Sequence, residues 1–285
     1  MSGEKMYAIV SKKDLAPNIK QLEITAAQVA SKARPGQFVV LRTHEQGERV
    51  PLTIQDWSLE RGTVSVVVLG AGKTTQQLNA LKKGDRLSNF IGPLGKPTDI
   101  EKFGTVVCVG GGVGIASIYP IARALKESGN RVISIIGAKT AELLIFEEEI
   151  KGFSDELHIA TDDGSKGQHG FVSGVLKKLI DEGRSLDRVI AVGPTLMMKA
   201  VAEVTRPKGI KTIVSLNPIM VDGTGMCGSC RVEVGGKTRF ACVDGPEFDA
   251  HLVNFDQLNV RNLRFVPDEK HSLERCRIQE SGEKK

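Results

Sequence analysis

The segment Asp222-Gly-Thr-Gly-Met-Cys227-Gly-Ser-Cys230, which Cys242 follows after eleven further residues, is the stretch around which the chain is organised. A plant-type [2Fe–2S] loop has the spacing C-x4-C-x2-C, with a fourth cysteine further along. Here the spacing is D-x4-C-x2-C-x11-C, so an aspartate occupies the position of the first thiolate. The glycines between these residues permit tight turns and let backbone amides approach cluster sulfurs. The pattern indicates an iron–sulfur site.

Two other interpretations of this segment are open. The same donors could hold zinc, although structural zinc sites mostly use four cysteines, three cysteines with one histidine, or two of each. The cysteines could also be ordinary turn and core residues. A carboxylate oxygen is a harder ligand than a thiolate. We therefore expect Asp222 to alter the potential of a cluster and its sensitivity to acid.

The composition is that of a globular protein. The chain has 285 residues, of which 40% are hydrophobic and 26% are charged, so it is long enough for two domains and a small module. The net charge of +5 comes with no basic run that alternates with aromatic residues, and this disfavours nucleic-acid binding. Three of the five cysteines are clustered, which indicates a reducing compartment. Residues 1–6 contain no apolar signal core, and no run approaches the roughly 18 apolar residues of a membrane span, so we expect a cytoplasmic protein without membrane attachment.

Residues 1–100 predict a small antiparallel β-barrel. Short apolar or alternating segments are separated by turn residues, which is typical of such barrels. A single helix is expected near Thr74–Leu81, opened by Gly70-Ala-Gly72. The expected strands are Tyr7–Val10, Ile19–Thr25, Phe38–Arg42, Pro51–Gln55 and Val64–Leu69.

Two motifs in this region resemble the flavin-binding elements of the ferredoxin–NADP reductase superfamily: Arg49-Val50-Pro51-Leu52-Thr53 and Gly70-Ala-Gly72-Lys73-Thr74-Thr75. The resemblance implies FAD held against the barrel by these residues. The Thr53 hydroxyl can hydrogen-bond the isoalloxazine edge, and a helix that begins at Gly72 offers amides to a pyrophosphate, with Lys73 adding charge. The sequence departs from the family pattern where Val50 takes the usual arginine position and Leu52 replaces the stacking aromatic residue. An edge strand with a solvated Arg49 is the alternative.

Residues 101–216 predict an open, mostly parallel sheet with helices on both faces, because apolar strands and amphipathic helices alternate. The expected strands are Thr105–Gly110, Arg131–Gly137, His158–Thr161, Arg188–Val192 and, last in the sheet, Thr212–Leu216. The expected helices are Ile115–Ser128, Glu142–Lys151, Gly174–Asp181 and Thr195–Val204.

The ends of three of these strands predict a pyridine-nucleotide site. The run Gly110-Gly111-Gly112-Val113-Gly114 departs from strict G-x-G-x-x-G spacing, so alone it also fits a simple strand–helix turn. Two further strand ends, Thr161-Asp162-Asp163 and Val192-Gly193-Pro194, point to the same edge. Gly193, Pro194 and Met197 resemble a nucleotide loop of the same superfamily. That resemblance implies NAD(H), with its pyrophosphate on the amides of residues 111–114.

Asp162 or Asp163 could accept hydrogen bonds from ribose hydroxyls, or could cap the next turn. Only Lys139 follows the second strand, and a 2′-phosphate would need more positive charge there, so we expect NADH rather than NADPH.

Residues 217–260 form the expected cluster module. Arg231–Val234 and Lys237–Ala241 predict a hairpin around Gly235-Gly236, which returns Cys242 towards Cys227 and Cys230. Asn262–Pro267 is expected to be extended. The remainder of the charged tail at 261–285, from Glu269 onward, predicts a frayed helix or disorder.

The order of barrel, nucleotide domain and iron–sulfur loop resembles the electron-transfer subunits of bacterial dihydroorotate dehydrogenase. With Asp222 in the first ligand position, it is more similar to the small (alpha) subunits of NADH-dependent reduced ferredoxin:NADP oxidoreductases, also known as sulfide dehydrogenase beta subunits. The resemblance implies one FAD, NAD(H), and one [2Fe–2S] cluster with ligands Asp222, Cys227, Cys230 and Cys242. It also implies a larger iron–sulfur flavoprotein subunit as partner, through which ferredoxin is reached.

The expected function is hydride exchange between NAD(H) and FAD followed by single-electron transfer through the cluster, as the NADH-side branch of such a complex, in which electrons can be bifurcated. No side chain is assigned as a catalytic acid, base or nucleophile. Two alternatives are a dihydroorotate dehydrogenase electron-transfer subunit, against which Asp222 argues, and a non-enzymatic redox or nucleotide sensor.

Overall fold

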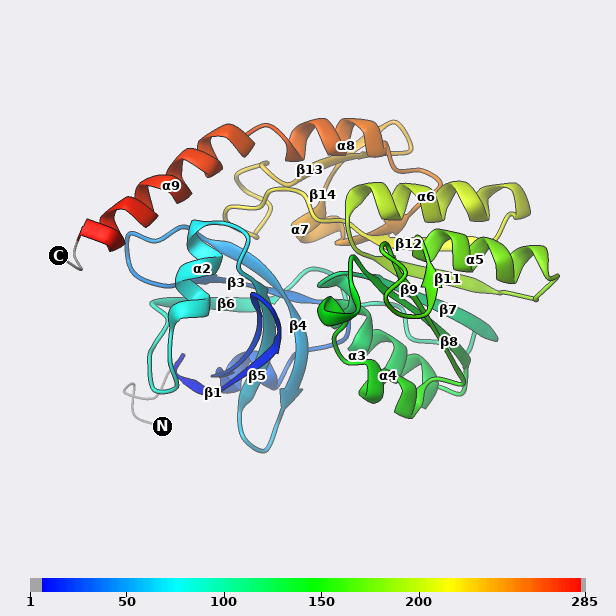
Figure 1. Cartoon of the computed structure of the whole chain (residues 1–285), viewed down its shortest axis with the longest axis horizontal. Helices are drawn as coiled ribbons and strands as arrows, with labels where there is room; N and C mark the ends of the chain where they lie inside the picture. Colours follow the sequence, from blue (N-terminus) through cyan, green and yellow to red (C-terminus); the bar gives the residue numbers. More distant parts are fainter. Residues whose placement is uncertain (1–6, 283–285) are drawn as a thin grey trace.

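The computed structural model describes residues 7–282, and their side chains as far as Glu274. Residues 1–6, on which part of the expectation about a signal segment rests, lie outside the described residues. Figure 1 shows two bodies side by side, a β-domain and an α/β domain, with a third segment lying along both. Within residues 7–282, no helix is long and apolar enough to cross a membrane.

The N-terminal domain is an antiparallel sheet of six strands in the order β1-β2-β5-β4-β3-β6. Its two edges meet, because Ala8 bridges Arg86 just before β6 and the Ile9 amide donates to the Asp85 carbonyl at 2.9 Å. Leu22, Ile24, Leu41 and Ile54 fill the interior. The elements are β1 Ile9–Ala16, β2 Ile19–Thr25, α1 Ala27–Ala30, β3 Phe38–Arg42, β4 Val50–Ser58, β5 Thr63–Leu69, α2 Lys73–Ala80 and β6 Asn89–Leu94.

Each of the five strands predicted for this domain overlaps an observed strand, although β1 runs from Ile9 to Ala16 and so extends well past the predicted end at Val10, and the predicted helix corresponds to α2. The sequence analysis missed β6. That strand contains Gly92 and Pro93, two residues that are depleted in strands, and it lies at the edge of the hydrogen-bonded order, where proline is tolerated.

The second domain is a seven-stranded sheet in the order β10-β9-β8-β7-β11-β12-β15, parallel except for its last strand. Helices α3 and α4 cover one face, and α5 and α6 cover the other, so the central strands are buried on both sides. The elements are β7 Thr105–Gly111, α3 Gly114–Glu127, β8 Arg131–Ala138, η2 Ala141–Leu143, α4 Glu147–Phe153, β9 Glu156–Thr161, β10 Gln168–His169, α5 Val172–Asp181, β11 Arg188–Val192, α6 Thr195–Thr205, η3 Arg206–Lys208 and β12 Lys211–Ser215.

The prediction that the strand near Thr212 ends this sheet was wrong. β15 (Glu247–Asp249), which follows the cluster segment, pairs antiparallel with β12, and Ser215 lies opposite Glu247. Three residues that begin and end with an acid give no strand signal, so the pairing depends on tertiary contacts. The cluster segment is therefore attached to the α/β sheet at both of its ends.

The third segment contains the predicted hairpin and two helices. Its elements are β13 Arg231–Val234, β14 Lys237–Phe240, α7 Ala241–Asp244, α8 Phe255–Asn262 and α9 Val266–Gly282. Gly235 and Gly236 both have positive φ, +60° and +71°, as a two-residue type I′ turn requires. The expectation of an extended Asn262–Pro267 was wrong, because α8 reaches Asn262 and α9 begins at Val266. Figure 1 shows α9 running back over the β-domain, where it contacts α2.

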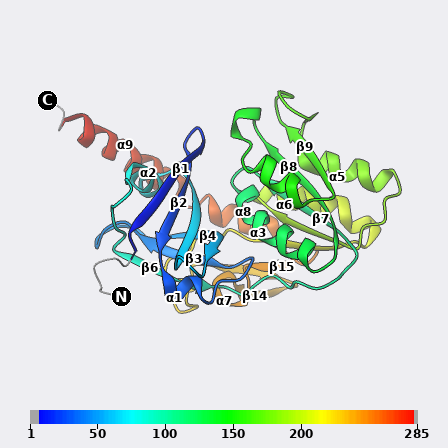
Figure 2. The ribbon, with the colours of Figure 1, turned by 90° about the horizontal axis from the view of Figure 1, so that it is seen from below.

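The observed architecture confirms the predicted fold class: an antiparallel β-domain, a mostly parallel α/β domain and a C-terminal module. The first two domains meet where α3 faces β4. Arg123 of α3 forms an ion pair with Asp56 of β4 at 2.9 Å. Figure 2, seen from below, shows α3 between the two domains.

Candidate redox site

The loop at residues 222–230 packs against the β-domain at Gly223. Gly223 has φ +76°, and a Cβ atom on it would lie 2.8 Å from Leu94 and 3.0 Å from Val40. Asp222 accepts hydrogen bonds from the amides of Thr224 and Cys227, each at 2.9 Å. These bonds, the Thr224 amide first, lower the pKa of Asp222, so its carboxylate is ionised and available as a ligand.

Cys230 and Cys242 form a close pair beneath this loop. Their sulfurs are 3.2 Å apart and both residues are buried. They come together because they flank the β13–β14 hairpin, in which Arg231 pairs with Phe240. Two thiolates that share one tetrahedral metal lie about 3.8 Å apart when each bond is about 2.3 Å. Burial raises the pKa of Cys242 to about 12, an effect that a bound metal would reverse because it deprotonates a coordinating thiol.

Cys227 is the exposed member of the set. Its sulfur lies 3.1 Å from the Ser229 hydroxyl, and that contact lowers the pKa of the thiol. Together with Asp222, whose carboxylate bonds its amide, Cys227 makes a second pair of donors. Two pairs fit a two-iron cluster, in which each iron takes two protein ligands.

The candidate flavin residues lie on β4 and at the start of α2. Thr53 accepts a hydrogen bond from Ser117 of α3 at 3.0 Å, so the hydroxyl stands where the two domains meet. At α2, Gly72 is extended, and a Cβ on it would meet nothing within 4 Å, which leaves space above the helix start next to Lys73. The Gly72 amide donates to Thr75, and the Thr74 hydroxyl donates to Glu48.

The remaining flavin candidates are less enclosed. Arg49 is exposed in the turn before β4, Val50, Pro51 and Leu52 are half-buried on β4, and the Gly70 amide donates to Asn18. The exposed Arg49 side chain fits both a solvated arginine and one that binds a phosphate group of FAD.

The candidate nucleotide loops meet at the carboxyl ends of β7 and β11, which are neighbours in the sheet. A Cβ on Gly114 would lie 2.2 Å from the Val192 carbonyl oxygen, and one on Gly193 would lie 3.2 Å from the Gly111 Cα. Met197 packs against both Gly111 and Gly193. Gly112 has φ +56°, and a Cβ there would be in open space. The loop thus leaves amides and space at the sheet edge, bounded by Val113 and by the exposed Pro194.

Asp162 and Asp163 are exposed on the loop after β9, two strands away from β7. The Asp163 carboxylate accepts from the amide of Ser165 at 3.0 Å and from its hydroxyl at 2.6 Å, so it caps this turn. Asp162 is the better candidate for a ribose contact.

Strand β3 joins the flavin side to the cluster side, a connection that the sequence analysis did not identify. Phe38 of β3 lies directly opposite Thr53 of β4. The same Phe38 packs in one apolar cluster with Cys230 and Cys242. The cluster loop and the candidate flavin strand are therefore one strand apart. The sequence-based analysis also missed Ser117, because one serine in an apolar helix carries no signal of its own.

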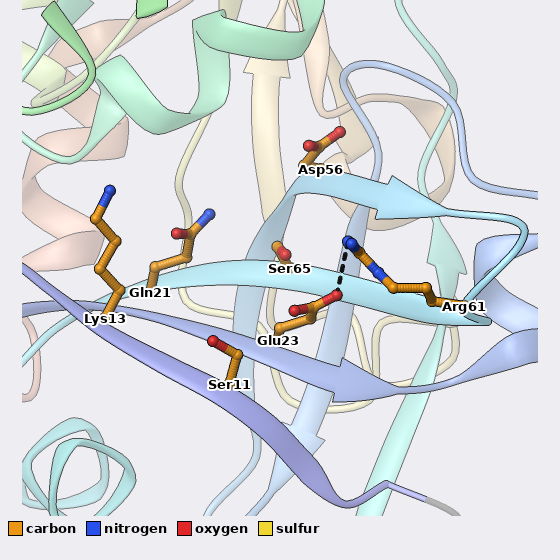
Figure 3. A pocket seen from close by; sticks show the side chains of 7 residues that line it. All are labelled: Ser11, Lys13, Gln21, Glu23, Asp56, Arg61 and Ser65. Atoms are coloured by element: carbon orange, nitrogen blue, oxygen red, sulfur yellow. Dashed lines mark ion pairs between the residues drawn. The ribbon is translucent and has the colours of Figure 1, made fainter. Parts of the chain in front are cut away.

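A separate polar hollow lies on the β-domain (Figure 3). It is bounded by the Glu23–Arg61 ion pair, 2.9 Å long, and contains none of the predicted site residues. Its lining residues are Ser11, Lys13, Gln21, Glu23, Asp56, Arg61 and Ser65.

Comparisons with known proteins agree with this geometry. Residues 217–254 match the family model described as the iron–sulfur cluster binding domain of dihydroorotate dehydrogenase B. The chain is 50% identical to a dihydroorotate dehydrogenase B (NAD(+)) electron transfer subunit homolog of Thermotoga maritima, over 96% of this chain and 97% of that protein. It is 34% identical to the electron transfer subunit of that enzyme from Enterococcus faecalis, over 88% and 98%.

Solved structures show the same relationship. A chain of the NADH-dependent reduced ferredoxin-NADP oxidoreductase, described in a study of flavin-based electron bifurcation, superimposes with a TM-score of 0.91 at 49% identity, over 96% of this chain and 99% of that one. Phthalate dioxygenase reductase shares the fold at 19% identity, with a TM-score of 0.54 over 80% and 85% of the two chains.

The fold and the site define an oxidoreductase of the flavin and iron–sulfur electron-transfer class. The chain belongs to the family of dihydroorotate dehydrogenase B electron-transfer subunits and their homologues. The predicted resemblance, class of activity and cofactor set of FAD, NAD(H) and an iron–sulfur cluster are confirmed at this level.

Proposed function

We propose that this chain is the NADH-side electron-transfer subunit of a ferredoxin:NADP oxidoreductase complex. It exchanges a hydride between NAD(H) and FAD and passes single electrons to a [2Fe–2S] cluster. The observation that carries the proposal is the position of β3, which has Thr53 as its cross-strand neighbour and the paired cysteines Cys230 and Cys242 against Phe38. Such closeness suits electron transfer between two centres.

The proposed residue roles follow from the local geometry. The Thr53 hydroxyl, fixed by Ser117, hydrogen-bonds the flavin edge, and the start of α2 with Lys73 receives the FAD pyrophosphate. The glycine turn after β7 receives the NAD(H) pyrophosphate, and Gly193 permits close approach of the nicotinamide end. Asp222, Cys227, Cys230 and Cys242 hold the cluster.

The flavin, when bound, can take two electrons from a hydride and release them one at a time. The chain's own residues orient NAD(H) and FAD towards each other at the boundary of the two domains. The Arg123–Asp56 ion pair and the Ser117–Thr53 hydrogen bond hold the α/β domain against the β-domain there.

A larger iron–sulfur flavoprotein subunit completes the complex and provides the path to ferredoxin. The exposed Cys227, next to Met226 at 88% exposure, places the cluster edge where such a partner can approach. Free cysteines at the site agree with a reducing, cytoplasmic location.

The test is NADH oxidation by the full chain carrying its flavin and cluster, with a one-electron dye and then with the larger subunit as acceptor. Dye reduction that depends on NADH, together with faster reduction of the larger subunit than of a plant-type ferredoxin added alone, supports the proposal. Binding of NADH without any electron transfer would instead favour a redox or nucleotide sensor. Electron delivery to a dihydroorotate-oxidising subunit would favour that alternative.

A further inference from the structure

Two arginines donate hydrogen bonds to the turn between the candidate ligands Cys227 and Cys230. Arg231 at the start of β13 donates from Nη1 to the Gly228 carbonyl at 3.2 Å. Arg261 near the end of α8 donates from Nη2 to the Ser229 carbonyl at 3.1 Å. Two successive carbonyls of the Cys-Gly-Ser-Cys turn are thus tied to guanidinium groups from different elements, β13 and α8, which lie side by side in Figure 1.

The position of Arg261 is fixed from both ends of its helix. At the start of α8, Asn254 and Gln257 donate to the two carboxylate oxygens of Glu233 in β13, at 3.2 and 3.0 Å. At its end, the Asn262 side chain donates to the Asn217 carbonyl at 3.3 Å. The helix is therefore anchored to the hairpin and to the residue that opens the module.

One hydrogen-bond donor of the Arg261 guanidinium group is not used within the described part of the chain. Its Nε atom is buried and has no hydrogen-bond partner among the described residues. A guanidinium group is permanently charged, and that of Arg261 lies within electrostatic range of Arg231, Arg264 and Cys230. A buried N–H of a charged group without an acceptor is costly, so an acceptor at this position is expected when the site is complete.

We propose that Arg261, assisted by Arg231, is a positioning residue that sets the reduction potential of the cluster. It holds the Ser229 carbonyl outward, so that the amides of the turn face the sulfurs, and it places a positive charge beside Cys230. Reduction adds one negative charge to the cluster, so a nearby cation stabilises the reduced form and raises the potential. This inference rests on the proposed cluster site.

The test is an EPR-monitored redox titration of the full chain with its flavin and cluster, for the unaltered protein and for Arg261→Gln. Without the charge, we expect the equilibrium constant for cluster reduction to fall about tenfold, which is a shift of about 59 mV towards lower potential for one electron. Arg261→Lys keeps the charge but loses the planar donor fork, so a smaller fall in the same direction is expected.

Arg264→Gln is the matched control. Arg264 is also an arginine close to Arg261, but it is exposed and is screened by water and salt, so little shift is expected. An Arg261→Gln chain with a full cluster and an unchanged potential would overturn the proposal. If that variant fails to retain iron, Arg261→Lys is titrated instead. An unchanged potential in Arg261→Lys would then overturn the proposal. Absence of iron from the unaltered chain would refute the proposed cluster site itself, which is a different result.

Discussion

The proposed nucleotide edge of the α/β sheet and the proposed cluster loop are built in opposite ways. The edge is built from closely packed glycines: a Cβ on Gly114 would clash with the Val192 backbone, and a Cβ on Gly111 or Gly193 would clash with the Met197 side chain. The loop is built from side chains with specific donor atoms, and its backbone only presents them. A backbone site tolerates no added atoms, whereas a side-chain site fails when a donor atom is exchanged. The two sites therefore respond to different mutations.

The largest expected effect is on the side-chain site. Cys242→Ser removes one of the two sulfurs that lie 3.2 Å apart, and we expect loss of most of the bound iron while FAD remains. Cys108→Ser is the control, because Cys108 is buried in β7 away from the loop. The measurement is iron per flavin after anaerobic purification. A full iron content in Cys242→Ser would show that Cys242 does not hold the cluster.

The backbone site is tested with Gly114→Ala. The new Cβ would lie 2.2 Å from the Val192 carbonyl oxygen, which is backbone and cannot rotate away. We expect NADH affinity to fall and the free energy of unfolding to fall by about 1–3 kcal/mol, as overpacking does. The matched control is Gly152→Ala in α4, where a Cβ meets nothing and should stabilise the helix by about 0.5–1 kcal/mol.

Iron content should stay unchanged in Gly114→Ala, because the cluster loop does not depend on this turn. Normal NADH affinity, measured by the rate of flavin reduction, would show that the glycine turn does not hold the nucleotide.

The junction of the two regions is sensitive to pH through Glu247. This carboxyl group on β15 is bonded by the Thr98 hydroxyl at 2.5 Å, and burial raises its pKa from 4.5 to about 7, with Asp99 contributing and Arg188 opposing. Below pH 4.5 it is neutral in both states. Between pH 4.5 and 7 only the unfolded chain ionises freely, so stability is lost as pH rises.

In Glu247→Gln this loss should disappear. We expect the parent to lose on the order of 2–3 kcal/mol more than the variant between about pH 5 and 8, discounted for partial exposure of the group. Thermal unfolding at both pH values measures the difference. Identical pH dependence of stability in the two proteins would show that folding does not raise the pKa of Glu247.

The smallest effect is expected at the boundary of the two domains. Ser117→Ala removes one hydrogen bond to Thr53, worth about 1 kcal/mol, so FAD affinity should fall roughly fivefold. Thr53→Ser keeps the hydroxyl and should bind FAD nearly as the parent does. Flavin fluorescence titration measures both, and a larger loss in Thr53→Ser than in Ser117→Ala would contradict the role given to the hydroxyl.

The sequence predicted the elements whose signal is local. The ligand spacing at Asp222–Cys242, the Gly235-Gly236 hairpin and the alternating strands and helices all depend on neighbouring residues. β6 and β15 were missed, because a strand with Gly92 and Pro93 and a three-residue strand with Glu247 become strands only through their partners. The contacts of Phe38, Ser117 and Arg261 join residues far apart in sequence, so no pattern along the chain could predict them.

The most direct test of the account is anaerobic purification of the full chain, followed by iron, zinc and flavin analysis and by EPR after dithionite reduction. The account predicts one FAD and about two irons per chain, with an S = 1/2 signal. Asp222→Cys should keep that signal but change its g values, and Asp222→Ala should weaken it. Zinc without iron, or a chain without flavin, would contradict the account.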